Sequence, residues 1–139
     1  MMIQVMGAFI AVISIAVTFG VPKKFLIHAG TVGAVGWLVH LILSSMGLPI
    51  VTSMFFAALT IALLSHSYAR ILKTPVTLFL ITGILPLVPG VGMYQIVYYL
   101  ITDDQKLSGY YFNQTMQIAG MIALAIFIID TVFRFFQKK

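Results

Sequence analysis

Residues 85–95 read LPLVPGVGMYQ and lie inside an apolar run from about residue 76 to 102. At ~1.5 Å per helical residue, that run is long enough to cross a hydrocarbon core of ~30 Å. Pro86 and Pro89 each remove a backbone donor and clash with the preceding turn. Gly90 and Gly92 let the backbone take angles that other residues avoid. The sequence therefore predicts a membrane-spanning helix that is broken near its centre.

The break has two interpretations. Single prolines explain most ordinary kinks, so a kinked packing helix is the simpler one. Two prolines three residues apart, followed by two glycines, favour an unwound joint between residues 76–85 and 91–100. Unwound backbone survives in a bilayer only where protein buries it or where it lines a wet cavity, and in transporters such joints mark binding sites. We expect the amides after Gly90 to favour an anion such as a carboxylate, because they lie at the positive end of a helix dipole.

The composition excludes a soluble domain. Of the 139 residues, 61% are hydrophobic and only 8% are charged, against about 25% charged in soluble domains. With no cysteine, and with three histidines lacking metal-ligand spacing, neither a metal nor a cofactor is expected. The net charge of +5 reflects few acids and basic residues at helix ends, so no nucleic-acid partner is expected.

Five apolar stretches predict an all-α integral membrane protein with a single transmembrane domain of five spans, at about residues 2–19, 25–46, 50–68, 76–102 and 110–136. This layout puts seven basic residues on one side: Lys23, Lys24, Arg70, Lys73, Arg134, Lys138 and Lys139. Only Lys106 falls on the other side. By the positive-inside rule, the N-terminus lies outside and the C-terminus in the cytoplasm of a multi-pass cell (plasma) membrane protein.

Polar residues near the break are candidates for binding a substrate. Tyr94 and Gln95 lie within one turn of the joint and either hydrogen-bond a polar substrate or pack. Asn113 and Gln117 share one face near the start of the last span. The candidate substrate-binding set is Pro86, Pro89, Gly90, Gly92, Tyr94, Gln95, Asn113 and Gln117.

Two titratable residues are candidates for carrying a proton. His40 lies on the glycine face of the second span and is either a neutral packing group or a proton carrier. Asp130 precedes Arg134 by four residues, so the two either form an interfacial ion pair or leave Asp130 as the only intramembrane carboxylate and natural coupling group. His66 is expected at the interface, outside the site.

An odd number of spans fits half of an inverted-repeat transporter. The sequence shows no internal repeat, so the second half is expected from another polypeptide or another copy of this one. The five-span layout, with Pro86-Leu87-Val88-Pro89-Gly90 and the Tyr94-Gln95 that follows, resembles the small membrane subunit of the threonine/serine exporter family over essentially the whole chain.

The resemblance implies a larger membrane partner with a cytoplasmic hydrolase-like domain and five spans of its own. It also implies export of threonine, serine or related small carboxylates, driven by the proton gradient. The residues of this chain that match the family's motif are Pro86, Pro89 and Gly90.

The alternative is a non-transporting scaffold that stabilises a larger transporter partner, in which Gly30, Gly33 and Gly36 serve assembly. An enzyme is not expected, because the sequence has no Ser-His or Glu-x-x-His arrangement and its isolated aspartate supplies no acid/base pair.

Overall fold

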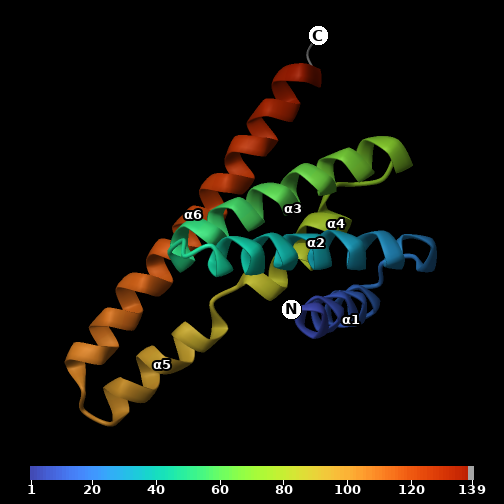
Figure 1. Cartoon of the computed structure of the whole chain (residues 1–139). Coiled ribbons are helices and arrows are strands. Elements are labelled where there is room, and N and C mark those ends of the chain that lie inside the picture. Colours follow the sequence, from blue (N-terminus) through green and yellow to red (C-terminus); the bar gives the residue numbers. More distant parts are fainter. Residues whose placement is uncertain (138–139) are drawn as a thin grey trace.

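The computed structural model describes residues 1–137, which form helices joined by short connections and contain no strand (Figure 1). The all-α prediction is confirmed for this part of the chain. The elements are α1 (Met2–Thr18), η1 (Lys23–Phe25), α2 (Leu26–Ser45), α3 (Ile50–Leu72), α4 (Thr77–Ile84), η2 (Leu85–Leu87), α5 (Gly90–Ile101) and α6 (Gln105–Gln137), where η marks a 3₁₀ helix.

Helix α2 is the centre of the packing, because α1, α3 and α4 all contact it. Glycines make this close approach possible. A side chain on Gly33 would collide with Val12 of α1, and one on Gly36 would collide with Ile61 of α3. Small residues of this kind let helices associate in a membrane, where no hydrophobic force drives them together.

Helices α5 and α6 form a hairpin whose turn lies away from the α1–α4 bundle (Figure 1). Helix α6 begins beside α5 and then packs along α3. No residue of α5 is buried. The connection from α4 to α5 is therefore the point at which the chain leaves the compact bundle.

The described residues supply three or four candidate membrane spans. Three helical segments are long and apolar enough to cross a membrane: Lys23–Ser45, Ile50–Leu72 and Gln105–Phe136. The pair Thr77–Leu87 and Gly90–Ile101 makes a fourth if it counts as one bent span. Helix α1 has 17 residues, about 26 Å at 1.5 Å per residue, and is therefore short for a ~30 Å core. The chain is a multi-pass membrane protein, and the fifth span stays a prediction.

The last helix begins at Gln105, five residues before the predicted start of the last span at residue 110. The side chain of Asp104 causes this early start, because its Oδ1 accepts a hydrogen bond from the Leu107 amide at 3.1 Å. Such a bond satisfies one of the free donors at a helix N-terminus.

The described basic residues gather at one end of the bundle, apart from Lys106. Phe25, next to Lys23 and Lys24, packs edge-on against Phe79, which in turn contacts Tyr68, two residues before Arg70. Arg70 contacts the end of α6 that carries Arg134. Lys106 lies in the first turn of α6, at the opposite end of that helix.

Candidate functional site

The predicted break is present in the structure. Helix α4 continues as η2 to Leu87, Val88 and Pro89 leave the helix, and α5 begins at Gly90. The helix direction changes by 44° across this joint. The Val88 amide still bonds to the Leu85 carbonyl at 3.2 Å, whereas proline has no amide hydrogen to offer. Two prolines thus end one helix and set the start of the next.

The first turn of α5 has two free backbone donors. The Gly90 amide donates to the Val88 carbonyl at 2.8 Å, and the Met93 amide donates to the Pro89 carbonyl at 3.1 Å. Within residues 1–137, the amides of Val91 and Gly92 donate no hydrogen bond. They are the orphan donors that every helix N-terminus leaves, and the helix dipole makes that position favourable for an anion.

A cavity of about 300 Å³ lies beside the break. Its walls come from the joint itself, from α2 and α3, and from the facing turn of α6. The polar side chains in the wall are Gln95 of α5 and Gln114 and Thr115 of α6; the other lining residues are Trp37, Ile50, Met54, Ile118 and residues 86–92. The free amides of Val91 and Gly92 therefore belong to residues that line an apolar cavity with a few polar groups, which is the usual composition of a small-molecule site.

Five of the eight predicted substrate-binding residues line this cavity: Pro86, Pro89, Gly90, Gly92 and Gln95. The other three, Tyr94, Asn113 and Gln117, are exposed and lie outside its lining. The ring of Tyr94 stacks on Tyr98 at a centroid distance of 6.0 Å instead.

The sequence did not identify Gln114 and Thr115 as residues of the cavity wall. Thr115 is buried and lies at the start of the inner stripe of α6, which continues through Ile118, Ile122 and Ala125. That stripe has the 3–4 residue spacing of a packed helix face. Extending it by one turn toward the start of α6 would have identified the face that meets the break.

His40 is buried behind the cavity and not in its lining. Its Nδ1 lies 2.9 Å from the Ser53 Oγ, and the Ser53 hydroxyl donates to the Ile50 carbonyl at 2.9 Å. With that hydroxyl proton engaged, His40 donates its Nδ1 hydrogen to Ser53. Trp37, whose ring centroid is 4.9 Å from that of His40, lines the cavity, as does Ile50. A short hydrogen-bond chain thus connects His40 to a residue of the cavity wall.

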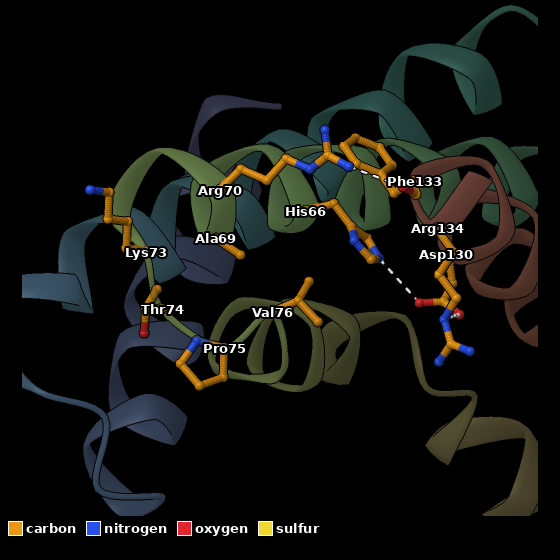
Figure 2. Close-up of a pocket in the computed structure, with 10 residues that line it drawn as sticks. All are labelled: His66, Ala69, Arg70, Lys73, Thr74, Pro75, Val76, Asp130, Phe133 and Arg134. Carbon is orange, nitrogen blue, oxygen red and sulfur yellow. Dashed lines mark hydrogen bonds and ion pairs between the residues drawn. The ribbon is translucent and has the colours of Figure 1, made fainter. Parts of the chain in front are cut away.

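Asp130 lies in a separate cavity of about 530 Å³ at the basic end of the bundle, shown in Figure 2. Its Oδ2 is 3.1 Å from Arg134 Nε, and its Oδ1 is 3.8 Å from His66 Nε2. The His66 ring stacks on Phe133 at 4.8 Å. The structure brings Asp130 together with His66 of α3, whereas His40 pairs with Ser53.

The fold and the site define a multi-pass membrane protein that has, at a broken helix, an apolar cavity with a few polar groups. The family model described as "Threonine/Serine exporter, ThrE" matches residues 4–132. The chain therefore belongs to the threonine/serine exporter family, a family of membrane transporters for amino-acid export and not of enzymes.

One curated protein, from Haemophilus influenzae, is similar to part of the chain. It is 34% identical over 89 residues, which are 63% of this chain and 30% of the relative, and it is described as an uncharacterized protein. The matched part is thus less than a third of that relative's length. No solved structure matches the chain significantly.

Proposed function

We propose that this protein is a subunit of a secondary transporter that exports threonine, serine or a related small carboxylate, and that it holds the substrate at the break between η2 and α5. The observation that carries the proposal is the cavity of about 300 Å³ at this joint. Its volume is at the lower end of the ~300–1,000 Å³ range of small-molecule sites, which suits a small amino acid.

The substrate carboxylate is placed against the amides of Val91 and Gly92, because these donors have no protein partner among the described residues and lie at the start of α5. Gln95, Gln114 and Thr115 supply the neutral donors and acceptors for the hydroxyl and amino groups. Without a charged side chain in the lining, recognition rests on helix-terminal backbone and uncharged side chains. Transporter folds with discontinuous helices bind carboxylates in the same way.

The proposed topology has five spans, with the N-terminus outside and the C-terminus in the cytoplasm. It counts α1 as the first span and the bent α4–α5 pair as the fourth. The gathering of basic residues at one end of the bundle supports this orientation, because positive charge is retained on the cytoplasmic side. The second half of the transporter would come from a larger membrane partner with a cytoplasmic hydrolase-like domain, or from self-association.

Proton coupling is assigned to Asp130 and His40. Asp130 is supported by its position between His66 and Arg134 in a cavity at the basic end. His40 is supported by the hydrogen-bond chain through Ser53 to Ile50 at the wall of the substrate cavity. An intramembrane titratable group is costly and therefore marks ion pathways by default.

The alternative function is that of a scaffold subunit, which would stabilise a larger transporter partner without binding substrate. No residue of α5 is buried, which favours this alternative, because the surface of α5 that does not contact α6 can serve as a docking surface. The two functions differ at the cavity: a scaffold would tolerate changes at Gln95 and Gln114, whereas a substrate-binding subunit would not.

The test is efflux of radiolabelled threonine and serine from vesicles that carry this chain with and without the presumed larger partner, at a fixed and at a collapsed proton gradient. Gradient-dependent efflux that requires this chain supports the proposal. A stable complex that exports neither amino acid nor other small carboxylates contradicts it and favours the scaffold.

A further inference from the structure

An apolar groove of about 460 Å³ lies where α3 meets α2 and α6, and it shares no lining residue with the cavity at the break. Its lining comes mainly from α3, with Phe56, Leu59 and Leu63, and is completed by Val39 and Leu43 of α2 and Ile129 of α6. Phe56 and Leu63 are 43% and 48% exposed, so these side chains are open to whatever surrounds the bundle. The groove therefore offers an apolar channel along the seam between α3 and α6.

The same seam becomes cationic at the basic end. Phe56, Leu63 and Arg70 follow one another at intervals of seven residues on α3, so they lie close to one face of the helix. On α6, Phe133 follows Ile129 after one turn. Arg70 and Phe133, together with Lys73, line the charged cavity next to this groove. One stripe thus runs from apolar side chains to an arginine.

Arg70 is held in a fixed position. Its Nη2 donates to the Phe133 carbonyl at 3.0 Å, and its guanidinium carbon lies 4.7 Å from the centre of the Phe133 ring. Figure 2 shows the side chain extended over Phe133, on the side of α3 that faces away from Val76. A guanidinium has five donors, and the Phe133 carbonyl engages one Nη group, so the others remain for a ligand.

Asp130 lines the same cavity as Arg70 and Lys73 but pairs with neither of them. Asp130 pairs with Arg134 and lies beside His66, and within residues 1–137 neither Arg70 nor Lys73 forms an ion pair with a carboxylate. Figure 2 shows the Lys73 amine pointing away from Asp130. The end of the groove is therefore positively charged, beside an apolar surface.

We propose that an anionic phospholipid binds along this seam, with its phosphate at Arg70 and Lys73 and one acyl chain in the groove beside Leu63. Free phosphate or a small carboxylate would use only the cationic end and would leave the apolar groove unused. A neutral lipid would use only the groove. The continuous change from apolar to cationic lining matches a molecule with an anionic head and an apolar tail, and basic pockets between spanning helices are known to take such headgroups.

The experiment is thermal unfolding of the full chain in a neutral detergent, titrated with dioleoylphosphatidylglycerol, with dioleoylphosphatidylcholine or with inorganic phosphate. We expect a saturable rise in the unfolding temperature with phosphatidylglycerol alone. Arg70→Gln should weaken the apparent phosphatidylglycerol affinity by about fivefold, the effect of one basic residue near an anionic lipid surface. Lys23→Gln is the matched control, because Lys23 lies at the same end but outside the seam.

A second variant tests the groove itself. Leu63→Trp fills the channel with a side chain that α3 can accommodate, because Leu63 is 48% exposed, and it should also reduce the shift caused by phosphatidylglycerol. An equal shift with phosphatidylcholine or with phosphate would overturn the proposal. It would equally be overturned if both Arg70→Gln and Leu63→Trp retained the wild-type response, or if Lys23→Gln lost it to the same extent.

Discussion

The hydroxyl of Thr115 on α6 occupies the position that a side chain on Gly92 of α5 would need. This contact brings the first turn of α5 against α6 at the wall of the cavity beside the break, to which both residues belong. The glycine therefore has a packing role that a proline-kink interpretation does not require. It fixes the distance between the free amides of α5 and the polar turn of α6.

Gly92→Ala should reduce threonine efflux, because the added methyl group would displace either Thr115 or α5 and change the cavity. The measurement is efflux at matched amounts of protein in the membrane. Gly120→Ala is the control, since a side chain there meets nothing within 4 Å. Normal efflux by Gly92→Ala would show that the close approach of α5 and α6 is not needed for transport.

Gly36→Ala should lower the stability of the bundle by about 1–3 kcal/mol, the usual cost of overpacking a tight core. The added methyl group would overlap the Ile61 side chain of α3. It would also lie 3.6 Å from the carbonyl oxygen of Ala57, which is on α3 as well. Thermal unfolding of the purified chain measures the effect. Gly7→Ala, with open space around it, should unfold at the wild-type temperature, and an equal loss in both variants would refute the packing argument.

Ser53→Ala should cost about 1–3 kcal/mol of stability, because it leaves the buried Nδ1 of His40 without its partner. Ser45→Ala removes an exposed hydroxyl that bonds only to the Ile42 carbonyl, and it should change stability much less. Chemical or thermal unfolding of the two variants provides the comparison. If the two serines proved equivalent, the His40–Ser53 bond would not be a stabilising contact.

Asp130→Asn should remove the dependence of efflux on the proton gradient, because the carboxylate that lies beside His66 would no longer be there to take up a proton. Arg134→Gln should preserve that dependence, since its exposed i,i+4 contact contributes little to the fold. Efflux at fixed and collapsed gradients distinguishes the two. Gradient-driven efflux by Asp130→Asn would assign coupling to another residue.

The sequence predicted those features that depend on short segments. The apolar runs predicted where the helices lie. Gly20 and Gly47, which follow α1 and α2 and did not enter that prediction, take positive φ angles of 78° and 90° that favour glycine. Pro86 and Pro89 placed the break because proline acts on its own helix. The family resemblance was also visible in this segment, and the match over residues 4–132 confirms it.

The features that the sequence did not predict depend on which helix faces meet. Asn113 and Gln117 share a face with each other, yet the neighbouring Gln114 and Thr115 face the break, because the rotation of α6 is set by its packing. His66 and Asp130 are 64 positions apart in the chain, and only the contact between α3 and α6 brings them within 3.8 Å. No local pattern at either residue encodes that contact.

The measurement that tests the central claim most directly is threonine efflux by Gln114→Leu and Gln117→Leu, compared at equal membrane expression. The two glutamines lie one turn apart on α6, and only Gln114 lines the cavity at the break. If the substrate binds there, Gln114→Leu should lose at least about tenfold in efflux, as expected from about 1.5 kcal/mol for one hydrogen bond. Gln117→Leu should then remain near wild type. Full efflux by Gln114→Leu, or an equal loss in both variants, would contradict a substrate site at the break.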